Sequence, residues 1–184
     1  PNADNYNADA NLDDGSCEYT FSEVTLYNLQ YATEATGDWD SDCYPSVYTD
    51  QYVTTSGVVT AVKPGEYPNF FIQGDEDSWA GAYVFDETIS PSIGDEISVS
   101  ALVIEYFGLT EISNVQEYEV LSTGNSINTV SIGTGDLGVA CNPTGEQYEG
   151  MLVTVENVIV ESINEFGSWY INDGSGTTKV DDYF

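Results

Sequence analysis

The chain has 184 residues, 41% of them hydrophobic and 13% aromatic, which is enough to bury one or two cores. It carries 32 acidic residues against two lysines, with no arginine and no histidine, for a net charge of −30. That charge repels phosphate backbones and anionic membranes, so it disfavours nucleic-acid and membrane binding. It attracts divalent cations, or it forms a solvated acidic surface of the kind found in salt-adapted proteins.

Strand-forming residues dominate the composition, whereas helix formers such as Lys, Arg and Met are nearly absent. The composition therefore predicts an all-β protein. No stretch of about 18 apolar residues is present, so we expect no membrane insertion. The chain starts at Pro1 without a signal peptide, and we interpret it as a mature or excised segment of a longer product.

Residues 1–20 contain mostly Asn, Asp, Ala and Gly without a periodic apolar face, and we expect an extended acidic N-terminal arm there. Within the arm, oxygen ligands stand at alternate positions before a glycine, which is the pattern that calcium loops require. The predicted calcium ligands are Asn5, Asp9, Asn11, Asp13 and Asp14. This is not an EF-hand, because Asp14 takes the position of the loop glycine. The alternative is a metal-free segment of Asx turns.

A second acidic run with a spacing of two is formed by Asp38, Asp40 and Asp42. Three carboxylates so close together repel one another unless a cation lies among them. The run is therefore a second candidate calcium site, and its alternative is a solvated loop.

The region 21–122 is expected to be one β-domain that begins with a leading strand within Phe21–Tyr31. The further strands that the apolar alternation and turn residues predict are, in chain order, Tyr52–Val62, Asn69–Gln73, Ala82–Phe85, Glu96–Tyr106 and Leu109–Glu119. Five short strands at regular spacing favour a small closed barrel of the OB type.

The same module begins again after a connector at 123–146. Gln51-Tyr52 matches Gln147-Tyr148, and Phe71-Ile72-Gln73 matches Tyr170-Ile171-Asn172. The strands expected in this second copy, at 147–184, are Met151–Val160, Ser168–Asn172 and Thr177–Val180. The second copy stops after its third strand, so we expect an incomplete β-unit with an unpaired edge.

Two cysteines, Cys43 and Cys141, stand in loops just before the two copies of the module. Because equivalent positions can be neighbours, we predict a Cys43–Cys141 disulfide, with two free thiols as the alternative. Cys17 is left without a partner. A zinc site is disfavoured, since the chain has no histidine and no CxxC pair.

Several stretches resemble the OB-fold modules of secreted bacterial nucleases and cell-surface proteins: SGVVTAV, FFIQ, GAYVF, IGDEISVSALVIEYFGLTEIS and QYEGMLVTVENVIV. Residues 5–18, NYNADANLDDGSCE, resemble an acidic NYNPxAxxDDGSC-type repeat of secreted proteins from aquatic, Bacteroidetes-like bacteria. The resemblance implies an OB-like barrel and an extracellular or cell-surface location. It also implies that Cys17 has lost an upstream partner. It implies little about function, because OB barrels host unrelated roles.

An OB barrel usually binds its ligand with aromatic side chains on one open face. The aromatic residues expected on that face are Phe70, Trp79 and Tyr83, whereas Phe71 and Phe85 are expected in the core. Since few cations are available, a neutral glycan fits this face better than nucleic acid. The alternative is that these rings pack in the core or at its rim.

Catalytic patterns are hard to find in this chain. Without histidine it has no Ser-His-Asp or Cys-His pair, and without arginine or a P-loop it has no phosphate-binding motif. We therefore expect a protein that is not an enzyme.

Two functions remain open. The first is a secreted structural protein, stabilised by calcium, that associates with other copies of itself by strand or arm exchange into a filament. The second is an OB-fold binding module, for a neutral glycan or as an accessory domain, within a larger secreted nuclease or adhesin.

Overall fold

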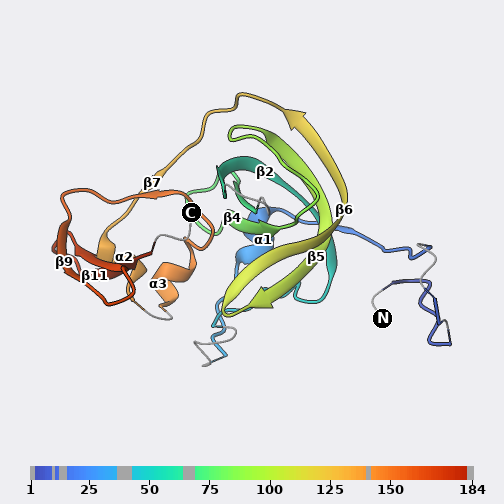
Figure 1. Ribbon diagram of the computed structural model, residues 1–184, viewed down its shortest axis with the longest axis horizontal. Helices are drawn as coiled ribbons and strands as arrows, with labels where there is room; N and C mark the ends of the chain where they lie inside the picture. The colour runs from blue at the N-terminus through green and yellow to red at the C-terminus, as the bar shows by residue number, and fades with distance from the viewer. Residues whose placement is uncertain are drawn as a thin grey trace.

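The computed structural model describes residues 3–9, 11–12, 16–36, 43–63, 69–139 and 142–181. These residues form a mostly β protein, as predicted, with a barrel and a smaller C-terminal unit beside it (Figure 1). The elements in chain order are β1 (Ser22–Glu23), α1 (Leu26–Gln30), β2 (Tyr52–Val62), β3 (Phe70–Gln73), β4 (Gly81–Phe85), β5 (Glu96–Tyr106), β6 (Leu109–Ser122), β7 (Val130–Ser131), α2 (Thr134–Leu137), α3 (Pro143–Glu146), β8 (Val153–Thr154), β9 (Ile159–Ile163), β10 (Trp169–Asn172) and β11 (Thr177–Val180).

Five strands close into a ring, because β2 pairs with β3 on one side and with β5 on the other. The order around the ring is β2-β3-β4-β6-β5, and every pair in it is antiparallel except the parallel pair β4–β6. Alternate residues of these strands point inward, as the sequence alternation indicates. The aliphatic and aromatic side chains that fill the barrel are Val53, Val59, Phe70, Ile72, Ala82, Val84, Ile97, Val99, Ala101, Val103 and Ile112.

The leading strand predicted within Phe21–Tyr31 is largely wrong. Only the two residues of β1 pair with β2, in parallel, and the chain then turns into the short helix α1. Thr25 caps the helix by accepting a hydrogen bond from the Asn28 backbone N–H at 3.1 Å. Leu26 and Leu29, three residues apart on one helix face, are buried against the barrel core.

The C-terminal unit is a three-stranded antiparallel sheet in the order β11-β10-β9, accompanied by the parallel pair β7–β8. The strand predicted over Met151–Val160 is wrong, because the chain breaks between β8 and β9, where Asn157 has a φ of 56°. Gln147-Tyr148 also does not match Gln51-Tyr52 in structure. Gln147 and Tyr148 lie in a turn after α3, whereas Tyr52 begins β2.

The sheet of the C-terminal unit reproduces the register of β2, β3 and β4. In the barrel the cross-strand rows are Val62–Phe70–Val84 and Val59–Ile72–Ala82, and in the C-terminal unit they are Ile163–Trp169–Val180 and Val160–Ile171–Thr178. Each sheet has one register shift at the same place, which skips Thr60 in β2 and Glu161 in β9. The match between Phe71-Ile72-Gln73 and Tyr170-Ile171-Asn172 is therefore confirmed.

The segments before the two sheets also correspond. β1 pairs in parallel with Val53 and Thr54 of β2, and β7 pairs in parallel with Val153 and Thr154 of β8. A short helix follows β1 and β7 in turn, with α1 contacting β4 and α2 contacting β11. The C-terminal unit is thus a copy of the barrel up to its third ring strand.

Candidate functional site

The face of the C-terminal sheet that corresponds to the barrel interior is open to solvent. We call Val160, Ile163, Trp169 and Val180 the open face. Their exposed fractions are 56%, 64%, 50% and 36%. Of the equivalent barrel residues, Val59, Phe70 and Val84 are 0% exposed and Val62 is half-buried. Adjoining exposed apolar side chains are a common feature of interaction surfaces in soluble proteins.

The difference between the two copies is the ribbon formed by β5 and β6. In the barrel, β5 pairs antiparallel with β2 and β6 pairs parallel with β4. Within the described part of the chain, β9 pairs only with β10 and β11 pairs only with β10. Among the described residues, neither outer edge of the C-terminal sheet has a neighbouring strand beside the open face.

The row Val160–Ile171–Thr178 is covered by the chain itself at two of its three positions. Ile171 is buried, and Thr178 is buried with its hydroxyl donating to the Gly138 backbone oxygen at 2.7 Å. Gly138 follows α2, which packs on β10 and β11. The helix closes one end of the sheet and leaves the row Ile163–Trp169–Val180 uncovered.

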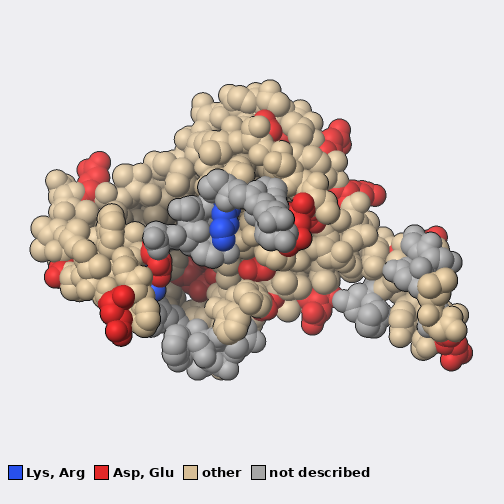
Figure 2. Space-filling model, viewed as in Figure 1, with Lys and Arg blue, Asp and Glu red and all other residues tan. Residues whose placement is uncertain are grey.

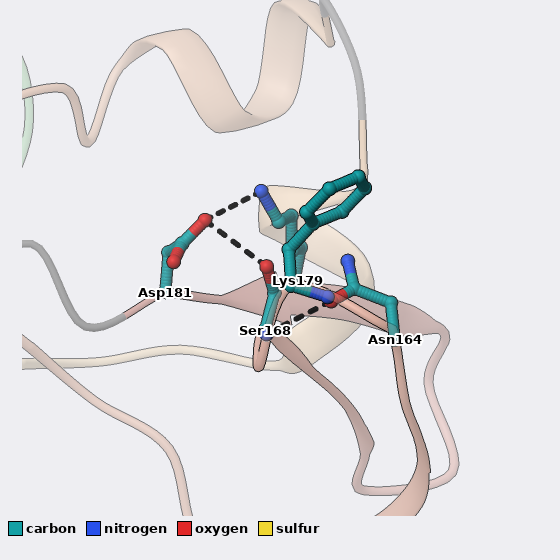
Figure 3. A network of polar contacts seen from close by, with 5 residues as sticks. Asn164, Ser168, Lys179 and Asp181 are labelled. Atoms are coloured by element: carbon teal, nitrogen blue, oxygen red, sulfur yellow. Dashed lines mark hydrogen bonds and ion pairs between the residues drawn. The ribbon is translucent and has the colours of Figure 1, made fainter.

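A polar network fastens the uncovered end of the sheet (Figure 3). Asp181 accepts from the Lys179 ammonium at 2.6 Å and from the Ser168 hydroxyl at 3.2 Å, which joins β11 to the start of β10. The Asn164 carboxamide accepts from the backbone N–H groups of Phe166 and Ser168 and so shapes the β9–β10 turn. These contacts hold the strands in register although one face is uncovered.

The segment 147–152, which we call the strap, joins the C-terminal unit to the barrel. The Trp79 backbone N–H donates to the Gln147 oxygen at 2.6 Å, and the Leu152 N–H donates to the Gln73 carboxamide at 2.8 Å. The strap therefore crosses β3 and the loop that follows it.

Two glycines meet where the strap crosses β4. A Cβ added to Gly81 would clash with the Gly150 backbone, and a Cβ added to Gly150 would lie 2.7 Å from the Ala82 nitrogen. Gly150 also has a φ of 68°, which a glycine adopts without steric cost. The contact requires glycine at both positions.

Four glutamates gather where the strap meets the barrel: Glu105, Glu111, Glu146 and Glu149. Glu149 keeps part of its surface exposed, but its carboxylate is enclosed and accepts from the Thr110 N–H at 2.9 Å. Burial, and then repulsion from Glu146, raise the Glu149 pKa to about 8. Burial, and then the charge of Glu105, raise the pKa values of Glu111 and Glu146 to about 7.

The predicted calcium ligands of the arm are only partly described. Asn5 uses its carboxamide within the arm, where it accepts from the Glu18 N–H at 3.1 Å and donates to the Ser16 oxygen. Asp9 and Asn11 are exposed, and Asp13 and Asp14 lie outside the described residues. In the ranges that the structure covers, no three Asp, Glu, Cys or His side chains are arranged to hold a metal ion.

The second candidate calcium site, Asp38, Asp40 and Asp42, also lies outside the described residues. Cys43 is buried and disulfide-bonded, and Cys17 is an exposed free thiol. Cys141 is not among the described residues, so the Cys43–Cys141 pairing stays a prediction.

The predicted ligand face is wrong for two of its three residues. Phe70 lies in the barrel core and Tyr83 is also buried, so neither ring is open to a ligand. Phe85, expected in the core, is instead exposed, and Phe71 is half-buried. Trp79 is partly exposed, and its ring lies 5.3 Å from that of Tyr31, which stacks at 5.3 Å on Tyr27.

The sequence predicted an incomplete C-terminal unit with an unpaired edge, but not the residues of the open face or the glutamate cluster at the strap. The sequence did contain a signal for the open face, because Trp169 and Val180 stand at the positions that align with Phe70 and Val84 of the barrel core. The glutamates had none, because each is one of 32 acids in the chain. Figure 2 shows acidic side chains scattered over the face in view. No helix in the described ranges has the length and hydropathy of a membrane span.

Comparisons with known proteins assign no family. No family model matches the chain, and no curated protein matches it. Among solved structures, the chain is similar to a crystal structure described as a putative aspartyl-tRNA synthetase from Leishmania major Friedlin, at 13% identity and a TM-score of 0.36. The match covers 71% of this chain and 26% of that one, and a likeness this weak carries no argument about function.

Proposed function

We propose that the chain is a non-catalytic structural protein that associates head to tail with copies of itself in an extracellular or cell-surface filament. The observation that carries this proposal is the open face, with its exposed aliphatic side chains and two unpaired strand edges. Strand addition at such an edge satisfies backbone hydrogen bonds and covers apolar surface at once. The resemblance to secreted OB-fold modules and acidic repeats supports the location.

The ribbon β5–β6 of a neighbouring copy is a poor donor. The described chain has two units but only one such ribbon, so exchanging it closes the C-terminal unit of one copy and opens the barrel of another. A useful donor is a segment that its own copy does not need.

The N-terminal arm meets that requirement. It is anchored where the Tyr19 ring lies 4.1 Å from the Tyr52 ring, and it then projects away from the barrel (Figure 1). Tyr6 and Leu12 are exposed apolar side chains on it. The arm and the C-terminal unit lie at opposite ends of the molecule (Figure 1), and a contact between opposite ends repeats without closing, which builds a fibre.

In this proposal, calcium binds the arm and stabilises its conformation. The arm brings its two ends together through the Asp4 N–H, which donates to the Glu18 oxygen at 2.7 Å. A cation bound by the acidic loop between them would stiffen the arm and reduce the entropy lost on docking.

The experiment is sedimentation velocity and electron microscopy with and without EDTA. We expect fibres that shorten in EDTA, and Ile163→Asp to abolish them. Ile93→Asp is the matched control, because Ile93 is an equally exposed isoleucine in the turn before β5. Globular monomers in all conditions, or equal loss from both variants, would overturn the proposal.

A second candidate is a glycan-binding module of a larger secreted protein, supported by the ring cluster of Tyr27, Tyr31 and Trp79. Neighbouring aromatic rings with exposed surface suit the apolar face of a neutral sugar. Glycan-array binding that Trp79→Ala removes and Ile163→Asp retains would favour this candidate over the filament.

A further inference from the structure

The strap covers a face of the barrel that the rest of the chain leaves available. An apolar cavity of about 290 Å³ lies between Phe71 and Ala61 of the barrel and residues 150–152 of the strap. Phe71 and Tyr83 face each other on neighbouring strands, with ring centroids 5.0 Å apart. Displacing the strap would expose Phe71 and free the C-terminal unit from β3 and β4.

We propose that the strap is a pH-sensitive closure, which lies on the barrel while Glu149 and the neighbouring Glu111 and Glu146 hold protons and lifts from β3 and β4 when they ionise. This goes beyond filament formation, because the strap connects the two units whether or not the open face binds a neighbour.

The groups that shift the Glu149 pKa through their charge are all acidic. Glu149 is faced by Glu146 from α3 and by Glu105 from β5, and Glu105 in turn faces Glu111 of β6. The α1 helix contributes only the neutral Gln30, whose amide donates to the Gly81 oxygen at 2.7 Å and which also hydrogen-bonds Glu149. β4 contributes the Gly81 backbone.

Cations are scarce around this cluster. The chain has two lysines and no arginine, and Lys179 is bound to Asp181 in the C-terminal sheet. No lysine is among the groups that shift the pKa values of Glu111, Glu146 and Glu149. Ionisation of the cluster therefore places like charges together with little compensation.

The direction of the pH effect follows from the raised pKa values. When the strap is closed, the Glu149 pKa is about 8, whereas a solvated glutamate has a pKa of about 4.3. The closed form thus binds more protons than the open form. Its stability is greatest below about pH 4.3 and is lost as the pH rises towards about 8. Glu111 and Glu146 act in the same direction, over a range that ends at about 7.

The experiment uses NMR to measure, in the full chain and from about pH 5 to about pH 9, the equilibrium constant for opening of the strap. The reporters are the backbone amides of Leu152 and Trp79. Both amides hydrogen-bond across the strap. We expect the opening equilibrium constant to rise roughly tenfold per pH unit per glutamate until the closed-state pKa is reached. The amide of Val99 in the barrel core should not respond.

Glu149→Gln keeps the size and the acceptor oxygen of the side chain and removes its titration. In this variant we expect the pH response of both amides to be reduced at least roughly tenfold, and the residual response, which Glu111 and Glu146 supply, to end at about pH 7. Glu156→Gln, on an exposed glutamate, should titrate like the unmodified chain. If Glu149→Gln does not fold, Glu146→Gln provides the same comparison. The proposal is overturned if the amides do not change with pH, or if they titrate identically in the variants and the unmodified chain.

Discussion

At the residue scale, the junction between barrel and C-terminal unit depends on two backbones that touch. Gly81 and Gly150 leave no space for a Cβ, and Gly150 also adopts a left-handed conformation. Such a contact brings backbone polar groups of the strap and the barrel close together, which is how the strap forms its hydrogen bonds to the barrel. Any side chain at either position must displace the strap.

We expect Gly150→Ala to destabilise the protein by about 3 kcal/mol, since it combines left-handed strain with a clash against Ala82. Gly124→Ala is the matched control. Gly124 has a φ of 71° and nothing within 4 Å of its added Cβ, so only strain of about 1 kcal/mol applies. Urea unfolding measures both variants, and equal losses would show that the close contact contributes nothing.

The residues of the core were only partly predictable from the sequence. The inward positions of β5 were predicted from the alternation of Ile97, Val99, Ala101 and Val103, all of which are buried. Phe70 and Phe71 are adjacent aromatics, so the sequence pattern fits either inward direction, and we predicted the wrong one. The glutamate cluster where the strap meets the barrel was not predictable, because it is assembled by tertiary contacts with β5 and β6.

At the element scale, one sheet design appears twice with different surroundings. In the barrel, β2, β3 and β4 are covered by β5 and β6, and the equivalent β9, β10 and β11 are covered only in part by α2. Residues at the same register position therefore contribute different amounts to the free energy of unfolding in the two copies.

The pair Val59 and Val160 tests this difference directly, because both occupy the same register position. Val59→Asp buries a charge in the core and should cost more than about 4 kcal/mol. Val160→Asp stays in solvent and should cost less than about 1 kcal/mol in a dilute monomer. Chemical unfolding at low protein concentration measures both. A large loss from Val160→Asp would mean that the open face is covered in solution.

The bounds of three strands were predicted correctly, and the two long ones, β2 and β5, have extended runs of apolar residues. The bounds expected for β2, β5 and β11 agree with the structure. The α1 helix was missed because five residues are too short to show helical periodicity, although Thr25 is a helix-capping residue. The break between β8 and β9 was missed because MLVTVENVIV reads as one apolar run, and Asn157 gave the only warning of a turn.

At the scale of the whole molecule, net charge opposes association. Two copies that each carry −30 repel each other over the Debye length, so a contact at the open face must overcome that repulsion. Added salt or calcium should therefore strengthen head-to-tail contacts. An ordinary surface salt bridge would behave in the opposite way.

The free thiol of the arm allows the contact to be trapped. In an Ile163→Cys variant, mild oxidation should link Cys17 of one copy to the new thiol of the next and give a ladder of covalent oligomers. Moderate salt should increase the yield, since it screens the repulsion. Cys17→Ser in the same background should remove the ladder, as seen by non-reducing electrophoresis. A ladder that persists would place the contact elsewhere.

The shared register of the two sheets also has a consequence for recombination. The three strands β2, β3 and β4 and the three strands β9, β10 and β11 present the same cross-strand rows and the same skipped residue, so their backbones offer equivalent attachment points to a closing ribbon. A crossover within this region would preserve strand pairing while it exchanges side chains such as Phe70 for Trp169. The C-terminal sheet thus has the same strand pairing as part of the barrel, and exchange between the two copies would vary the core side chains without changing that pairing.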